Sequence, residues 1–183
     1  YYHQKIYRNP FNLIEVYHAY KNICELCMKG KYINCVKKSC NKGSKAKSFI
    51  GALEGYYYRS TIHTNMGSGK YYGVQKLKIP FSTEYINWAN DDDFMEAILK
   101  VLDDEKYTEG KFMTWLTTVS SHQPYSVSSK QGDAFYDMTK DTGYSSDVRR
   151  YMSKMKILDN GLGVLLDGLE ERGILDDTVI VMF

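Results

Sequence analysis

The chain has 183 residues, 43% of them hydrophobic, and a formal net charge of +2 at pH 7. This length and composition are typical of a globular domain with a sizeable core, and they exclude an intrinsically disordered chain. No run approaches the ~18 consecutive apolar residues of a membrane span, and the first residues lack the apolar core of a signal peptide. The charge is uneven, because residues 1–48 hold ten Lys or Arg against two Glu. We therefore separate a basic N-terminal segment, residues 1–47, from a domain over residues 48–183.

All four cysteines lie in the basic segment and follow a C-x2-C-x7-C-x4-C pattern. Two pairs of thiolates can complete a tetrahedron around zinc, so a zinc site is one interpretation. The alternative is thiols that bind no metal, because the linker is short and the first pair falls at the end of a predicted amphipathic helix over residues 11–28. The positive charge favours a solvated face or an anionic membrane surface over nucleic acid. The cysteines are Cys24, Cys27, Cys35 and Cys40.

Residues 48–80 are rich in Gly and Tyr, and neither a helical nor an alternating period holds across them. The stretch that follows the predicted helix, through Cys40 to Lys45, is also loop-like in composition. We therefore predict that residues 48–80 line a ligand site, with Arg59 and His63 among the residues they contribute. The Gly-Ser-Gly-Lys run at residues 67–70 is a poor phosphate loop, because it lacks the preceding apolar strand and the spacing of a nucleotide P-loop.

Residues 91–104 predict a helix. Three aspartates at its start suit the positive end of a helix dipole, and apolar residues with helical spacing follow directly. The three carboxylates could instead bind a hard cation. The helix-start interpretation is favoured because the apolar period begins immediately behind them. The apolar face consists of Phe94, Met95, Ile98, Leu99, Val101 and Leu102.

Residues 112–119 are an apolar run rich in Thr, Val and aromatic side chains, without Gly or Pro, which predicts a buried strand. The run breaks into a polar loop at residues 120–125, which contains His122. Ligands of open α/β sheets bind beyond the carboxyl ends of the strands, so His122 stands where chemistry is expected. The alternative is that this histidine belongs to a solvated turn without a role.

Residues 126–142 are polar and are expected to cover the site. A long helix is predicted over about residues 145–172, capped by a serine, with large apolar side chains along one stripe. The continuous apolar run at residues 178–183 predicts a strand buried on both faces. Strand, helix and strand in this order form a right-handed crossover, so we predict an α/β fold with strands 112–119 and 178–183 parallel in one sheet. The stripe comprises Val148, Tyr151, Met152, Met155, Leu158, Leu162, Leu165, Leu166 and Leu169.

Several short runs, in this order, resemble one protein family: the sulfatase-fold extracellular domain of lipoteichoic acid synthases and related phosphoglycerol transferases. The resemblance covers about residues 48–183. It implies an incomplete α/β domain of the alkaline-phosphatase type, with a largely parallel sheet and flanking helices. The runs that carry it are Tyr58-Arg59 and residues 63–67, 117–125, 151–166 and 173–181.

The resemblance also implies an activity. In this family a divalent metal, usually manganese, is held by a Glu, a Thr nucleophile and an Asp-His pair. The Thr attacks phosphatidylglycerol, releases diacylglycerol and passes glycerophosphate to a growing polymer outside the bacterial cell membrane. Carried over to this sequence, Arg59 grips the phosphate, His122 contacts the glycerophosphate, and His63 belongs to the substrate loop. The implied partners are an anionic phospholipid or a glycerophosphate polymer, with membrane attachment through a segment outside this chain.

The sequence also departs from the family pattern. Nine residues before Arg59 the family commonly has a substrate histidine, and this chain has Ile50. No run matches the upstream Glu and Thr, and the Asp-His pair would follow Phe183. We therefore assign no nucleophile and no metal ligand, and we expect the chain to be a fragment. An inactive sulfatase-like remnant that binds anionic lipid or polymer is the alternative. In both cases Arg59 and His122 are expected to line one site.

Overall fold

The computed structural model describes residues 45–80, 88–104, 108, 110–123, 125 and 135–182. The predicted helix over residues 11–28, the four cysteines and much of the predicted cover over residues 126–142 lie outside this part. The described elements, in chain order, are β1 (Lys45–Ile50), η1 (Tyr56–Tyr58), α4 (Arg59–Asn65), β2 (Lys70–Tyr72), α5 (Val74–Leu77), α6 (Asp91–Asp104), β3 (Phe112–Thr117) and α8 (Ser146–Glu171).

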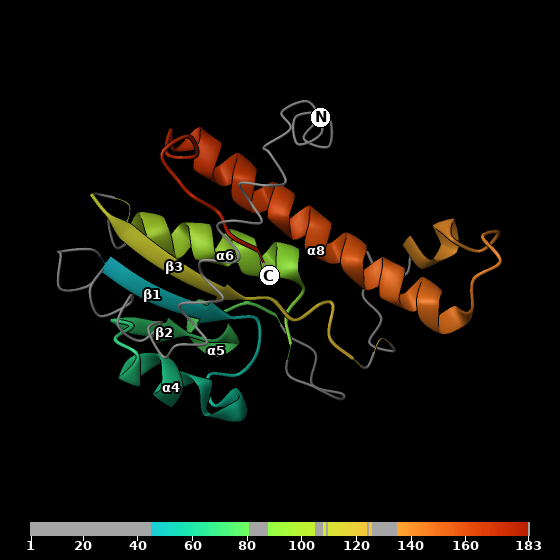
Figure 1. Cartoon of the computed structure of the whole chain (residues 1–183), viewed down its shortest axis with the longest axis horizontal. Coiled ribbons are helices and arrows are strands. Elements are labelled where there is room, and N and C mark those ends of the chain that lie inside the picture. Colours follow the sequence, from blue (N-terminus) through green and yellow to red (C-terminus); the bar gives the residue numbers. More distant parts are fainter. Residues whose placement is uncertain are drawn as a thin grey trace.

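The three described strands form one parallel sheet in the order β2-β1-β3. Ser48 in the central strand pairs with Tyr71 of β2 and with Trp115 of β3, which fixes the register on both sides. Helices lie on the two faces of this sheet, with α4 on the side opposite α6 and α8 (Figure 1). This arrangement confirms the predicted α/β class and its parallel sheet.

β1 was missed by the sequence analysis, which treated residues 48–80 as a loop. The strand also crosses the compositional boundary between residues 47 and 48. Its pattern is hidden because both faces are covered and because Lys47 is only 7% exposed, with its ammonium over the ring of Tyr72. Phe49 and Ile50 point to opposite faces, and both are fully buried. A strand buried on two sides shows no apolar and polar alternation.

The main core lies between the sheet and the helix pair α6 and α8. Phe49 stacks on Tyr72, with ring centroids 4.9 Å apart, and both rings pack beneath α6. The predicted helix over residues 91–104 is confirmed as α6. Its fully or almost fully buried residues are Asp91, Phe94, Met95, Ile98 and Leu102.

The predicted long helix is confirmed as α8, and Ser145 caps it by accepting a hydrogen bond from the Val148 amide. The buried line along α8 differs from the predicted leucine stripe. Leu158, Leu162 and Leu166 are only half-buried, and small residues lie where α6 approaches closely. The N-terminal half of α8 extends beyond the sheet (Figure 1). The buried residues are Ser153, Lys154, Ile157, Gly161, Leu165, Gly168 and Leu169.

The predicted strand at residues 178–183 is wrong for this structure. Residues 178–182 form no strand, and Val179 and Met182 are 88% and 67% exposed. Thr178 instead donates hydrogen bonds to the carbonyls of Ile174 and Leu175, in the turn that follows α8. An apolar run becomes a strand only when another backbone pairs with it, and none of the described residues does so here.

Candidate functional site

The carboxyl ends of β1, β2 and β3 meet at one edge of the sheet. The segments that follow β1 and β3 and the segment that precedes α6 approach one another closely there. The Gly51 amide donates to the Thr117 carbonyl at 3.1 Å, and the Gly51 carbonyl accepts from the Ala89 amide at 2.8 Å. A Cβ on Gly51 would come within 2.9 Å of the side chain of Val119. The segments that follow β1, precede α6 and follow β3 are therefore joined in one frame, at the place where open α/β sheets bind ligands.

His122 lies at this edge, in the turn that follows β3. Its amide donates to the Val119 carbonyl at 3.0 Å, and its exposed ring packs edge-on against Trp88 with centroids 4.9 Å apart. Its Nδ1 atom is 2.5 Å from the Gln123 carbonyl oxygen. The predicted location of His122 beyond a strand end is confirmed, and its imidazole is accessible from solvent.

Arg59 begins α4 on the same side of the sheet edge. Its Nε atom is buried and finds no hydrogen-bond partner in the described part of the chain. The hydroxyl of Tyr71 is in the same state, and burial raises the pKa of that phenol to about 12. The positive charge of Arg59 acts on Tyr71, which places the two groups near one another. Buried donors without acceptors are uncommon in folded proteins, and clusters of them mark ligand sites.

A row of aromatic rings leads from the turn before Arg59 to His122. The ring of Tyr56, which precedes Arg59 in the chain, is 6.2 Å from that of Trp88, and Trp88 contacts His122. Trp88 also leaves its indole Nε1 buried without a partner among the described residues. The rings therefore link the segment before α4 with the loop that follows β3. Whether Arg59 and His122 share a ligand stays a prediction.

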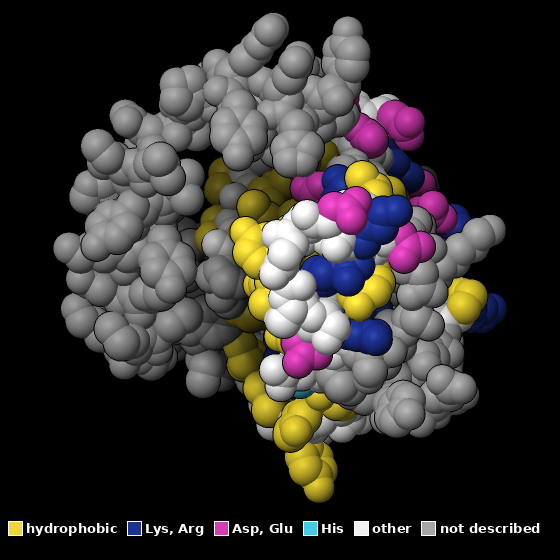
Figure 2. Space-filling model, turned by 90° about the vertical axis from the view of Figure 1, so that its right-hand side faces the viewer, with side chains coloured by type: hydrophobic (Ala, Val, Ile, Leu, Met, Phe, Trp, Pro, Cys, Tyr) yellow, Lys and Arg dark blue, Asp and Glu magenta, His cyan; other side chains and the backbone are white. Residues whose placement is uncertain are grey.

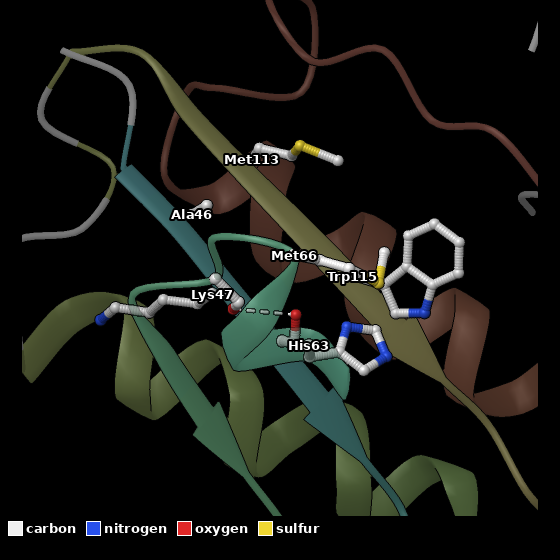
Figure 3. Close-up of a pocket in the computed structure, with 8 residues that line it drawn as sticks. Ala46, Lys47, His63, Met66, Met113 and Trp115 are labelled. Atoms are coloured by element: carbon white, nitrogen blue, oxygen red, sulfur yellow. Dashed lines mark hydrogen bonds between the residues drawn. The ribbon is translucent and has the colours of Figure 1, made fainter. Parts of the chain in front are cut away.

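His63 lies on α4 and points into a small cavity between this helix and the sheet. Figure 3 shows its imidazole beside the indole of Trp115, and the ring centroids are 5.7 Å apart. The cavity has a volume of about 10 Å³, room for about one water molecule. Burial, helped by the charge of Arg59, lowers the pKa of the His63 imidazole. In this conformation His63 therefore faces the interior, and its role in substrate contact stays a prediction.

Tyr57 and Tyr58 stand beside Arg59 with left-handed backbones, at φ of 49° and 56°. Their side chains are 74% and 80% exposed. Such conformations cost energy for residues other than glycine, and they gather at functional sites. The sequence analysis named Tyr58 only as part of the Tyr58-Arg59 run and did not predict these backbone conformations, because they have no signal in residue type.

Asp91 makes a contact that the sequence analysis did not anticipate. The start of α6 was predicted correctly, but the Asp91 carboxylate does not serve its own helix. It accepts hydrogen bonds from the amides of Val119 and Ser120, both at 3.2 Å. Burial raises the pKa of this carboxyl, and the two hydrogen bonds act in the opposite direction. The sequence contains no short-range signal for a contact that joins residues so far apart.

A divalent metal is implied by the family resemblance, but the described residues do not fit one. Among them, no three His, Cys, Asp or Glu side chains are grouped so that they could hold an ion. The predicted alternative of a cation at the three aspartates is thus not supported, since Asp91 turns to the β3 loop. In the same part of the chain, no helix is both long and apolar enough to cross a membrane.

Comparisons with known proteins agree with this architecture. The family model described as Sulfatase matches residues 34–183, which is most of the chain. The lipoteichoic acid synthase of Staphylococcus saprophyticus is 22% identical over 142 residues, covering 78% of this chain and 21% of that protein.

Two solved structures share the fold. The lipoteichoic acid synthase LtaP from Listeria monocytogenes aligns with a TM-score of 0.61 at 21% identity, over 78% of this chain and 34% of that one. A protein of the alkaline phosphatase superfamily from Vibrio parahaemolyticus aligns with a TM-score of 0.55 at 14% identity, over 75% and 31%. The chain thus spans about a third of these structures and about a fifth of the curated relative. It belongs to the sulfatase family, and over the matched residues it is similar to lipoteichoic acid synthases.

Proposed function

We propose that this chain provides the phosphate-recognising edge of a metal-dependent phosphoglycerol transferase. The enzyme would act on phosphatidylglycerol in the synthesis of lipoteichoic acid or a related cell-envelope polymer, at the outer face of the cell membrane. Manganese would be the metal, held by residues outside the described part. Arg59 and His122 would contact the glycerophosphate, and His63 would support the substrate loop.

The observation that carries the proposal is the buried Nε atom of Arg59, which finds no hydrogen-bond partner among the described residues, as the buried hydroxyl of Tyr71 also does not. A phosphate offers several strong acceptor oxygens, and hydrogen bonds from an arginine to a phosphate are stronger than those between neutral groups. An anion that reached this edge would satisfy donors that the described protein leaves unsatisfied. His122 would add a further donor from the loop after β3, within the same row of aromatic side chains.

The described residues on one face show no extended basic surface. On the face drawn in Figure 2, Lys and Arg side chains alternate with Asp and Glu side chains, and the coloured residues form no field of one sign. Attraction between interspersed surface charges is screened over about 8 Å at physiological ionic strength. Recognition of one phosphate group therefore depends on a few buried donors at the sheet edge.

Titration of glycerol 1-phosphate into the 183-residue chain, followed by NMR, tests the proposal. Arg59→Ala is expected to weaken binding about ten- to a hundredfold, because charge-assisted hydrogen bonds contribute on the order of 1.5–3 kcal/mol. Arg149→Ala is the matched control. That guanidinium donates to the Tyr136 carbonyl and the Thr139 hydroxyl near the start of α8, and its loss should leave the affinity unchanged. Equal affinities for the wild type and Arg59→Ala would contradict the proposal.

A second candidate function is supported by Ile50, which takes the position of a substrate histidine in the related family. Its side chain is fully buried in a cluster with Ala52, Tyr71 and Val119, so no imidazole equivalent is available there. The alternative is a sulfatase-like remnant that binds anionic lipid or polymer without turnover. In the longer protein that contains this chain, release of diacylglycerol from phosphatidylglycerol vesicles in the presence of manganese supports the transferase, whereas vesicle binding without release supports the remnant.

A further inference from the structure

Asp91 forms a closed set of hydrogen bonds with the chain that leaves β3. Its Oδ1 atom accepts from the Val119 amide and its Oδ2 atom from the Ser120 amide, each at 3.2 Å. In return, the Asp91 amide donates to the Ser120 hydroxyl at 3.2 Å. Both oxygens of one carboxylate are thus engaged by two successive amides, a geometry that fixes the backbone between them.

This carboxylate is not needed to begin α6. The Phe94 amide is satisfied by the Asn90 carbonyl, and the Asp93 amide bonds to the side chain of Asp92. Asp91 is fully buried, next to Phe94 and Val119. A buried carboxylate is costly unless it is well hydrogen-bonded, so its presence indicates a specific contact rather than a solubilising charge.

The chain on both sides of this contact leads to His122. The Val119 carbonyl accepts from the His122 amide, so the turn that carries the imidazole starts at a residue held by Asp91. On the other side, Trp88 lies three residues before Asp91 and supplies the surface against which the His122 ring packs. Asp91 therefore fixes both the turn and the ring surface on which the imidazole lies.

The anchor itself is held from behind by α8. A Cβ on Gly161 would lie 2.8 Å from the backbone carbonyl group of Asp91, which shows that the two helices touch at this point. We propose that Asp91 is a positioning residue that fixes the position of His122 relative to α6 and α8. The value of this placement for substrate binding rests on the proposed function, while the placement itself does not.

NMR of the 183-residue chain tests the proposal with Asp91→Asn. In the Asn variant an NH2 group replaces one carboxylate oxygen. One of the two hydrogen bonds is therefore lost, and the NH2 group faces the backbone N–H that had made it. We expect the nuclear Overhauser contacts between the rings of His122 and Trp88 to disappear. Hydrogen exchange at the Val119 and Ser120 amides should accelerate at least tenfold more than exchange elsewhere in the sheet.

Two further variants keep the test decisive. Ser120→Ala removes the hydroxyl that accepts from the Asp91 amide and also interacts with the Asp91 carboxyl, but it leaves both backbone amide bonds to the carboxylate, so it should give the same changes at smaller amplitude even if Asp91→Asn does not fold. Leu102→Ala is the matched control, because this buried residue lies at the opposite end of α6 from Asp91. Its truncation lowers stability without removing any hydrogen bond between Asp91 and the loop after β3. The ring contacts should survive in Leu102→Ala.

Two results would overturn the inference. One is an intact contact between His122 and Trp88 in both Asp91→Asn and Ser120→Ala. The other is loss of that contact in Leu102→Ala as well, which would reduce the role of Asp91 to global stability. Glycerol 1-phosphate affinity gives a separate answer. If the wild type does not bind this probe, the proposed function fails, and the ring contacts and amide exchange still decide the role of Asp91.

Discussion

Unsatisfied donors are the most informative feature at the scale of single residues. A buried polar group without a partner costs about 1–3 kcal/mol, so a protein that retains several at one edge gives up stability there. The Arg59 Nε atom, the Tyr71 hydroxyl and the Trp88 Nε1 atom all belong to this group. Binding sites are often less stable than the rest of a fold, because groups arranged for a ligand remain unpaired without it.

Tyr71→Phe tests this reasoning by removing an unpartnered hydroxyl and keeping the ring. The free energy of unfolding should rise by about 1–3 kcal/mol, because a desolvated group is deleted and no hydrogen bond is lost. Urea denaturation measures the change. Tyr151→Phe is the control, since that ring is 42% exposed and its hydroxyl removal should alter stability little. Destabilisation by Tyr71→Phe would mean that the hydroxyl has an acceptor in solution.

His63 should make stability depend on pH. Its folded-state pKa is below the ordinary 6.5 because of burial and then the charge of Arg59. Above pH 6.5 the imidazole is neutral in both states, and its contribution is fully present. As the pH falls below 6.5, the unfolded chain binds the proton more readily, so stability is lost until the pH passes the folded pKa.

His63→Phe keeps a ring against Tyr71 and Trp115 but cannot titrate. The difference in unfolding free energy between wild type and variant should therefore shift in favour of the variant between pH 7.5 and pH 5. Urea denaturation at both pH values measures it. A difference that stays constant over this range would show that the imidazole is as accessible to protons in the folded state as in the unfolded one.

The sequence placed His122 correctly beyond the end of β3 because the end of an apolar strand is a local signal, whereas a site shared by Arg59 and His122 stays a prediction. The contacts that hold His122 there could not be predicted in the same way. Asp91 reaches across to Val119 and Ser120, and Trp88 reaches Tyr56 and His122, through the pairing of distant segments. Residue type alone also hides the left-handed backbone of Tyr57 and Tyr58.

Among the secondary-structure elements, the close contact between α6 and α8 depends on glycines of α8, which have no side chain. A Cβ on Gly168 would meet Leu99 at 2.2 Å, and one on Gly161 would meet the backbone of Asp91. Small residues on α8 thus let α6 lie close to it. The sequence analysis counted only large apolar residues and so placed the buried face of α8 on the leucines.

Gly161→Ala should destabilise the protein although alanine is the better helix former. The gain in helix propensity is about 1 kcal/mol, but a methyl group 2.8 Å from rigid backbone forces the helices apart, at a cost of about 1–3 kcal/mol. Gly163→Ala provides the control on the same helix. A Cβ there meets nothing within 4 Å, so this variant should be stabilised by up to about 1 kcal/mol.

Thermal unfolding of both variants separates the two effects. The melting temperature should fall for Gly161→Ala and rise for Gly163→Ala. A rise in both would mean that α8 can shift away from α6 without loss, and that the close approach at Asp91 is not tightly constrained.

At the scale of the whole molecule, the sheet order and the helix layers agree with the fold class predicted from the sequence. The exception is the segment 178–182, whose apolar pattern predicts a strand and whose side chains are exposed. Burial of a strand is decided by the neighbour that pairs with it, which the pattern of one segment cannot specify. The chain spans about a third of each of the two solved structures with which it aligns.

The position of β1 in the sheet also determines how the chain folds. β1 is the central strand of the described sheet, yet it precedes both of its partners in the sequence. Pairing with β3 must wait until α4, β2, α5 and α6 have been synthesised, and distant pairing of this kind forms slowly because loop closure comes before the contacts that offset it. Until then Phe49 lacks the packing of α6 and α8, and Ile50 lacks the packing of Val119. The time during which β1 of a nascent chain can associate with a wrong partner is therefore set by the number of residues between β1 and β3, and not by the sequence of β1 itself.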